Sequence, residues 1–320
     1  VVGRDLHPEP FTDQQDKTMS LFNYVVSKTI MHVPKPIVSH FAKGYIAGPT
    51  LADAVQLTKD LNQQGIMTTI DILGEFITRI DEAISFKNDG LEILRTIDRE
   101  KLDANLSIKP TQMGLLLDKE RCFEIIHELV SEAKALDNFI RIDIEDVPVT
   151  DDTFDFFRKL REEFPGHVGT AFQGYLRRTP QDIVDLGDGY QNYRLCKGIY
   201  IESRKDAWKN PQAINRNYTT CLEQLFKQEA YVGIATHDEQ LIFEAMNLIR
   251  KMQLTPDQYE FQMLLGVDEE LREIILAAGH RLRIYVPYGE DWLPYSKRRL
   301  KENPTIAQHA LKQMFGLNKH

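Results

Sequence analysis

Cysteine is scarce in this chain. Only three cysteines, Cys122, Cys196 and Cys221, occur among its 320 residues, and they are widely spaced. That spacing excludes a disulfide framework and a cysteine-based metal centre, which need paired or clustered thiols. The nine histidines include no pair at metal-ligand spacing, so no metal site is expected. A reducing compartment, the cytoplasm, fits this composition best.

The chain also has no apolar run long enough for a membrane span and no excess of basic residues. No stretch approaches the roughly 18 apolar residues of a spanning helix, and no signal-peptide core is visible. The formal net charge of -9 argues against nucleic acid as the main partner, because phosphate binding needs clustered Lys and Arg. A hydrophobic content of 42% is sufficient for a large core.

Short β-branched runs alternate with longer amphipathic stretches along the chain. Eight runs are predicted as strands: 67–73, 104–109, 139–144, 168–172, 193–196, 231–235, 258–263 and 282–286. Helical periodicity predicts helices between them, among others over 75–89, 121–136, 153–163, 213–227 and 238–253. This alternation favours parallel βαβ units, and eight of them favour a closed (β/α)₈ TIM-type barrel of the α/β class. An open doubly wound sheet is the alternative, weakened because no GxGxxG motif follows an early strand.

Polar residues are predicted at the carboxyl ends of nearly all the strands, which is where barrels of this class carry their chemistry. They are Asp71, Lys109, Asp143, Gln173, Arg194, Thr236, His237, Gln262 and Tyr285. Buried charges need partners, and a ring of polar side chains around one mouth can supply them. Lys109 and Asp143 end neighbouring strands, so an ion pair between them is expected. Asp71 is assigned instead to capping the helix that follows it.

The segment 288–303 places two adjacent arginines on a short predicted helix behind the last strand. At helical spacing Tyr295, Arg298, Arg299 and Glu302 share one face. Two guanidiniums and a phenol on one face can bind a small carboxylate. Taken alone, a solvated basic face is the simpler interpretation.

Motifs in series along the chain resemble those of the proline dehydrogenase family. They include GYLRRTPQD at 174–182, RLCKGIYIE at 194–202, ATHD at 235–238, YEFQMLLGV at 259–267, RIYVPYG at 283–289 and the YxxRR signature at 295–299. NLSIKPTQMGL at 105–115 and RIDIED at 141–146 extend the match. The resemblance covers residues 45–304 and points to the monofunctional bacterial type, because the chain is too short for the aldehyde dehydrogenase domain of bifunctional members. A helical arm over 1–44 and a terminal helix over 305–320 are expected to flank the barrel.

The resemblance implies a distorted barrel that binds FAD non-covalently and oxidises L-proline to Δ1-pyrroline-5-carboxylate by hydride transfer to flavin N5. Asp143 and Arg194 would be catalytic, with Arg194 near that nitrogen. Substrate contacts would come from Lys109, Leu264, Tyr285, Tyr295, Arg298, Arg299 and Glu302. Cofactor contacts would come from Ile144, Gln173, Arg194, Lys197, Gly198, Ile199, Tyr200, Thr236, His237 and Gln262. Ile199 is bulkier than the third residue of the family's KGA motif.

The resemblance also implies electron transfer to a quinone or membrane acceptor, reached by peripheral contact at the inner face of the membrane. A pyrroline-5-carboxylate dehydrogenase would act downstream.

Two other classes of function stay open. Lys109 could be the nucleophile of a Schiff-base aldolase barrel, or the barrel could be a binding module without chemistry. His237 is either a flavin contact or a satisfied loop histidine, and Arg177 and Arg178 are expected to cover the barrel rim.

Overall fold

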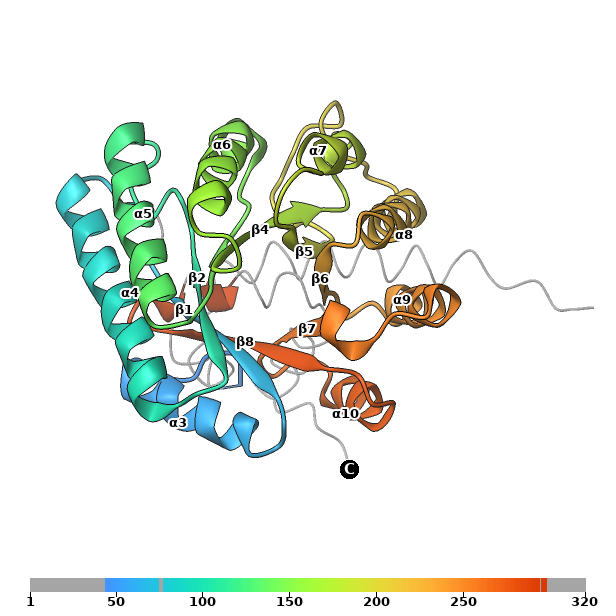
Figure 1. The fold of residues 1–320 in the computed structure, drawn as a ribbon, viewed down its shortest axis with the longest axis horizontal. Helices are drawn as coiled ribbons and strands as arrows, with labels where there is room; N and C mark the ends of the chain where they lie inside the picture. Colours follow the sequence, from blue (N-terminus) through green and yellow to red (C-terminus); the bar gives the residue numbers. More distant parts are fainter. Residues whose placement is uncertain (1–43, 75–76, 294, 298–320) are drawn as a thin grey trace, which may run out of the picture. The chain divides into compact units, whose positions relative to one another are not determined.

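In the computed structural model, residues 44–74, 77–293 and 295–297 are described (Figure 1). The chain divides into two units, and one of them, Gly44–Glu290, contains every strand and helix named below. The expected terminal helix 305–320, and the expected arm as far as residue 43, lie outside the described residues.

Eight parallel strands form a closed barrel in sequence order (Figure 1). They are β1 (Met67–Ile72), β2 (Ala104–Ile108), β3 (Ile140–Ile142), β4 (Val168–Gln173), β5 (Asn192–Cys196), β6 (Tyr231–Ala235), β7 (Tyr259–Leu264) and β8 (Leu282–Tyr288). β1 pairs with β8, with Thr69 opposite Tyr285, and this pairing closes the ring. The predicted barrel is therefore confirmed, and the open sheet is excluded because it would leave two unpaired edges.

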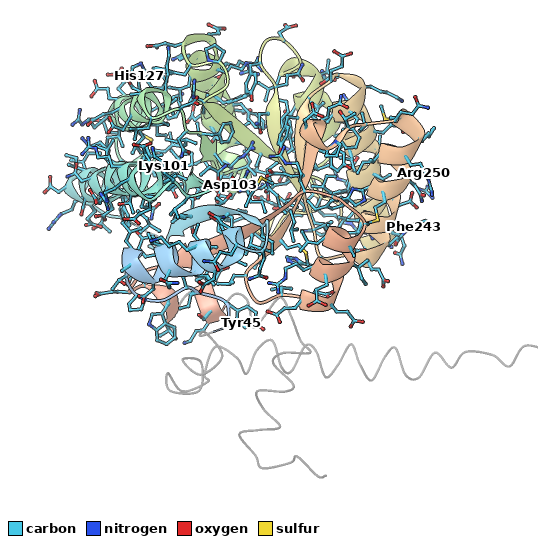
Figure 2. All side chains as sticks on the ribbon, turned by 60° about the horizontal axis from the view of Figure 1, so that its bottom comes forward. Tyr45, Lys101, Asp103, His127, Phe243 and Arg250 are labelled. Atoms are coloured by element: carbon cyan, nitrogen blue, oxygen red, sulfur yellow. The ribbon has the colours of Figure 1, made fainter. Side chains whose placement is uncertain are left out.

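Helices surround the strands on the outside of the barrel (Figure 1). They are α3 (Leu51–Asn62), α4 (Ile80–Glu100), α5 (Lys119–Ala135), α6 (Val147–Glu163), α7 (Thr179–Asp185), α8 (Pro211–Lys227), α9 (Glu239–Met252) and α10 (Glu269–Ala277), with a short 3₁₀ helix, η2 (Pro256–Gln258). Charged side chains occupy their outer faces, as Arg250 does on α9 (Figure 2).

Two helix starts differ from the prediction by more than two residues. α4 begins at Ile80 rather than at residue 75, and Arg79 precedes it without a side-chain cap in the described structure. α6 begins at Val147 rather than at residue 153, and its first turn includes a proline. Proline is tolerated there because the N–H that it lacks has no partner within the helix.

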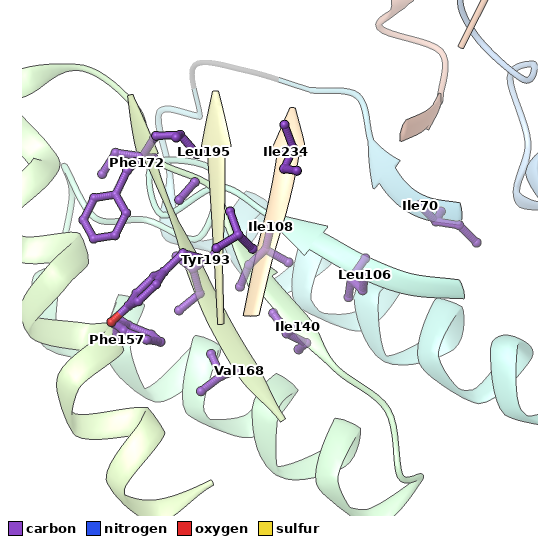
Figure 3. Packing of buried hydrophobic residues seen from close by; sticks show 14 of the residues in the cluster. Ile70, Leu106, Ile108, Ile140, Phe157, Val168, Phe172, Tyr193, Leu195 and Ile234 are labelled. Atoms are coloured by element: carbon purple, nitrogen blue, oxygen red, sulfur yellow. The ribbon is translucent and has the colours of Figure 1, made fainter. Parts of the chain in front are cut away.

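Alternate strand residues face the helices and the barrel interior, because successive side chains of a strand point to opposite faces. The helix-facing set is apolar and buried (Figure 3): it includes Ile70, Leu106, Ile108, Ile140, Val168, Leu195 and Ile234. Phe157 of α6 packs edge-on against Tyr193 of β5, with ring centroids 5.6 Å apart. The main hydrophobic core is thus the layer between strands and helices.

The set that faces the barrel interior is largely polar. Asp71, Ser107, Arg141, Arg194, Glu260 and Gln262 are all buried. The strands therefore have a mainly apolar outer face that stabilises the fold, and several of them have polar inner residues that must find partners within the barrel. That inner face positions the candidate site.

Candidate active site

Lys109 follows β2 at the carboxyl-terminal mouth of the barrel. Its Nζ lies 2.7 Å from Asp71 Oδ1 on β1 and 3.6 Å from Asp143 Oδ2 after β3. The predicted pair of Lys109 and Asp143 is confirmed, but Asp71 is the closer partner. Asp71 is only 2% exposed, and a carboxylate buried so deeply needs a cation. Its assignment as the cap of the next helix was wrong, because that helix begins nine residues later at Ile80.

Asp143 accepts several donors at once. Ser107 Oγ donates to its carboxylate at 2.8 Å and the Tyr285 hydroxyl at 2.9 Å, and Arg194 forms an ion pair with it. Burial acts to raise the pKa of Asp143, but Arg194, Lys109 and the two hydroxyl donors outweigh it and hold the pKa below its usual value. Asp143 is therefore an anion between two cations at neutral pH.

The same contacts keep Lys109 charged. Burial acts to lower the pKa of Lys109, but its attraction to Asp71, Tyr285 and Asp143 raises that pKa well above the usual value. A Schiff-base nucleophile needs a neutral amine and therefore a lowered pKa. The site thus disfavours the aldolase interpretation, and a permanently charged Lys109 is suited to binding an anion.

Besides its ion pair with Asp143, Arg194 has a second partner deeper in the barrel, Gln262 of β7. Its Nε donates to Gln262 Oε1 at 2.7 Å, and Gln262 Nε2 donates to Glu260 at 2.6 Å. The ring of Tyr285 lies beside this guanidinium, with its centroid 5.2 Å from the Arg194 Cζ atom. Lys109, Asp143, Arg194, Tyr285 and Gln262, which were predicted as strand-end residues, are therefore connected in one network.

Charged and polar groups also meet where β5 and β6 end. Lys197 Nζ lies 2.8 Å from Asp238 Oδ2, to which Asn215 Nδ2 also donates at 3.1 Å. Thr236 is buried, and its hydroxyl accepts the Asp238 N–H at 3.1 Å. Asn215 Oδ1 is buried without a hydrogen-bond partner among the described residues. An acceptor left in that state can serve a bound group.

Gly198 adopts a backbone conformation that only glycine takes readily, with φ at 109°. A Cβ on it would lie 2.1 Å from the ring of Tyr175, so the loop can pass this ring only without a side chain. The Tyr175 hydroxyl in turn donates to the carbonyl of Tyr200 at 3.2 Å. Ile199, between them, is 47% exposed.

His237 joins two strand ends. Its Nε2 accepts the backbone N–H of Leu264 at 2.8 Å, which places the proton of a neutral ring on Nδ1. The contact holds His237, which follows β6, against the end of β7.

On β4, Gln173 Nε2 donates to the carbonyl of Glu145 at 2.8 Å. Ile144, beside Glu145, is buried.

Four predicted substrate contacts, Tyr295, Arg298, Arg299 and Glu302, do not belong to the unit Gly44–Glu290. Arg298, Arg299 and Glu302 fall outside the described residues. Tyr295 belongs to the helical residues 292–293 and 295–297, which the unit Gly44–Glu290 does not include.

The second arginine pair, Arg177 and Arg178, follows β4 and makes contacts of its own, separate from those of Asp143. Arg178 Nε lies 2.8 Å from Asp182, and the Arg177 guanidinium stacks 3.8 Å from the Trp208 ring centroid.

Within the described ranges, no three His, Cys, Asp or Glu side chains lie together as a metal centre would need. None of the described helices is long and apolar enough to cross a membrane.

Comparisons with known proteins agree with each other. The family model described as proline dehydrogenase matches residues 54–311. Proline dehydrogenase 1 of Bacillus subtilis subsp. natto is 34% identical over 271 residues, covering 85% of this chain and 89% of that protein. Proline dehydrogenase of Deinococcus radiodurans is 32% identical over 279 residues, covering 86% of this chain and 90% of that protein.

Solved structures of proline utilization A (PutA) share the fold. PutA from Bdellovibrio bacteriovorus matches with a TM-score of 0.78 and 23% identity over 88% of this chain. A mutant of PutA from Bradyrhizobium japonicum matches with a TM-score of 0.72 and 20% identity over 84% of this chain. The chain spans only 34% and 32% of those two proteins. At these identities the likeness concerns the fold alone.

Proposed function

The chain belongs to the proline dehydrogenase family, and from that premise we propose that it oxidises L-proline to Δ1-pyrroline-5-carboxylate with FAD as the hydride acceptor. The observation that carries the proposal is the buried network of Lys109, Asp143, Arg194 and Tyr285 at the carboxyl-terminal mouth. In this network Lys109 is a cation that can bind a carboxylate, Tyr285 supplies an aromatic ring, and Arg194 is a second cation with partners of its own.

Lys109 is proposed to bind the proline carboxylate together with Arg298 and Arg299. Three cations around one carboxylate leave positive charge in excess, and buried charge of one sign is costly. Asp71 and Asp143 balance it, since both lie within 4 Å of Lys109, at 2.7 and 3.6 Å. Tyr285, with the proposed partners Leu264 and Tyr295, would pack against the pyrrolidine ring, and Glu302 would balance the arginine pair.

The residues at the ends of β4, β5 and β6 fit a flavin nucleotide. Lys197 supplies a cation steadied by Asp238, and Asn215 Oδ1 is a buried acceptor without a partner in the described chain. Gly198 lets the loop that carries Lys197 pass against the ring of Tyr175, which a Cβ at this position would meet at 2.1 Å. The residues proposed to bind the cofactor are Ile144, Gln173, Arg194, Lys197, Gly198, Ile199, Tyr200, Thr236, His237 and Gln262.

FAD, when bound, supplies the two-electron acceptor that the conversion of a C–N single bond to C=N requires. Asp143 and Arg194 are the proposed catalytic residues. The Arg194 guanidinium, fixed by Asp143 and Gln262, would stabilise negative charge that develops as a hydride leaves the substrate. Asp143 would keep that guanidinium and Lys109 apart and oriented.

An absorption spectrum tests the proposal. The purified protein is expected to show flavin bands, and anaerobic addition of L-proline is expected to bleach them. Acid precipitation should release the flavin into the supernatant. A colourless protein that takes up no FAD would favour the binding-module alternative, and flavin kept on the denatured chain would contradict non-covalent binding.

We also propose a quinone-type acceptor, a peripheral membrane contact and a downstream pyrroline-5-carboxylate dehydrogenase. The support is family membership alone. Proline-dependent reduction of a soluble quinone, with the rate unchanged when oxygen is removed, is the expected result. Reoxidation by oxygen alone would contradict this part.

A further inference from the structure

A chain of hydrogen bonds runs down the barrel from Arg194 away from the substrate mouth. Arg194 Nε donates to Gln262 Oε1 at 2.7 Å, and Gln262 Nε2 donates to Glu260 Oε1 at 2.6 Å. Gln262 and Glu260 are alternate residues of β7, so both point into the barrel. Glu260 is 2% exposed and also lines a hollow of about 430 Å³ at the opposite, amino-terminal mouth.

Donor and acceptor chemistry fixes the orientation of the Gln262 amide. An arginine only donates, and an ionised carboxylate only accepts. Gln262 lies between one of each, so its oxygen must face Arg194 and its nitrogen must face Glu260. If the amide were reversed, its NH₂ would face a guanidinium and its oxygen a carboxylate, and both contacts would be lost. Glu260 thereby determines which end of Gln262 meets Arg194.

Glu260 is itself held firmly. Arg283 Nε and Nη2 donate to its two carboxylate oxygens at 2.6 and 3.0 Å, and the Tyr231 hydroxyl donates to Oε2 at 2.7 Å. Arg283 Nη1 is anchored on the carbonyl of Thr68 at 2.7 Å. A two-pronged ion pair of this kind resists rotation of the carboxylate.

Room for the Gln262 side chain comes from β6. Gly233 pairs with Glu260 in the register of β6 and β7, and a Cβ on it would stand 2.3 Å from Gln262 Nε2 and 2.7 Å from Gln262 Cδ. Any residue with a side chain at position 233 would therefore displace the amide that connects Arg194 to Glu260. The displaced atoms are the end of a flexible side chain, so the rest of the barrel need not move.

We propose that Glu260 is a positioning residue for Arg194, acting through Gln262 from the amino-terminal side of the barrel, with Gly233 providing the space. The proposal rests on the proposed function, in which Arg194 acts on the reacting centre. The hydrogen bonds from Glu260 through Gln262 fix the position of the Arg194 guanidinium along the barrel axis. Without it, Arg194 would keep only Asp143 as a described anchor and could tilt toward that carboxylate.

Three variants test the idea in the FAD-loaded protein. Glu260→Gln places a neutral amide against Gln262. That amide can both donate and accept, so position 260 no longer forces the Gln262 oxygen to face Arg194. Gly233→Ala keeps every charge and displaces only the bridge. Tyr231→Phe is the matched control, because it removes a bond to the same carboxylate without touching Gln262.

Gly233→Ala and Glu260→Gln are expected to lower kcat for proline about tenfold to thirtyfold, the size of one lost charge-assisted hydrogen bond, with KM changed less than threefold. The reduction potential of the bound flavin should become more negative in both, because a tilted Arg194 stabilises the reduced form less. Tyr231→Phe should leave kcat and the potential near wild type.

A crystal structure of Gly233→Ala adds a readout that does not depend on turnover. Loss of the contact between Arg194 Nε and Gln262 is expected. Unchanged kcat and potential in Gly233→Ala, or an equal change in Tyr231→Phe, would overturn the positioning role. If Glu260→Gln fails to fold because Arg283 is left unpaired, Gly233→Ala decides alone. Absence of proline oxidation in the wild type would instead refute the proposed function, while the crystal structure would still test the bridge.

Discussion

In the part of the chain that the structure describes, the strands place cations and carboxylates together in the barrel interior: Lys109, Arg141, Arg194 and Arg283 beside Asp71, Asp143 and Glu260. Among the described residues, Arg141 donates to neutral acceptors, the carbonyls of Thr170 and Asn192 and the Asn192 side chain. Burial lowers the pKa of Arg141 to about 9, which still leaves it charged at neutral pH. Arg141 is therefore a buried cation without an ion-pair partner among the described residues.

Replacing Lys109 by Met tests the proposed carboxylate contact. Loss of a desolvated charge-assisted contact is worth roughly 2–4 kcal/mol, or on the order of 30- to 1000-fold in kcat/KM for proline. Lys59→Met is the control, because Lys59 forms an exposed pair with Glu100. FAD content should survive in both variants. An unchanged kcat/KM in Lys109→Met would remove Lys109 from the substrate site.

Tyr285 is expected to set the substrate range. Its ring lies between Lys109 and Arg194, whose charged ends are 5.9 and 5.2 Å from the ring centroid. A packed ring offers neither volume nor a hydrogen-bond partner to a substituent on the pyrrolidine. Proline should be strongly preferred over trans-4-hydroxy-L-proline, and Tyr285→Ser should narrow the ratio of kcat/KM values. Tyr285→Phe keeps the ring and should keep the preference; a constant ratio in all three proteins would place Tyr285 away from the ring.

The sequence predicted the site residues at the strand ends but not the inward-facing residues two positions earlier on the same strands. Lys109, Asp143 and Tyr285 were found because a (β/α)₈ barrel carries chemistry at those ends. Ser107 and Glu260 lie two positions earlier on their strands, where alternation alone places them inside. Listing every inward position would have found them. The closeness of Asp71 to Lys109 also depends on the pairing of β1 with β2, which no local pattern encodes.

Among the elements, strands were predicted better than helix starts. The strands are short runs between clear breaks, and their apolar outer faces are marked by β-branched residues. The start of α4 was placed five residues too early, since apolar periodicity continues through 75–79 and the preceding Arg79 supplies no capping side chain. A helix without a side-chain cap leaves little trace in the sequence.

The contact between α4 and α5 depends on one glycine. A Cβ on Gly90 would stand 2.9 Å from Leu129 Cδ2 of α5 and 3.3 Å from Leu106 Cδ2 of β2. Gly90→Val is therefore expected to lower the free energy of unfolding by about 1–3 kcal/mol through overpacking. Asn88→Val is the control on the exposed face of the same helix. Urea unfolding measures the free energy of unfolding of both variants. Because valine has a higher helix propensity than glycine, a loss confined to Gly90→Val reports overpacking, and equal effects would contradict it.

At the scale of the whole molecule, stability should fall in acid through Glu260. Burial acts to raise the pKa of Glu260, but Arg283, Tyr231 and Gln262 lower it to about 2. Because the folded pKa lies below the unfolded value of about 4.3, this contribution is complete above that value and is lost as the pH falls toward 2.

Wild type and Glu260→Gln should therefore converge in acid. Between pH 6 and pH 3 the gap between their free energies of unfolding is expected to narrow by about 2 kcal/mol. Urea unfolding at each pH, with the same FAD concentration throughout, gives the comparison. A gap that stays constant over this range would show that Glu260 titrates normally.

The pairing of β1 with β8 also bears on how the chain folds. Arg283 donates to the carbonyl of Thr68, 215 positions earlier, and the two strands run side by side over Met67–Ile72. Contacts of such long sequence separation carry a large loop-closure entropy and slow folding. During synthesis the ring stays open until its last strand has left the ribosome, and β1 and β7 each present an unpaired edge until then. The nascent barrel is therefore most exposed to aggregation just before β8 joins it.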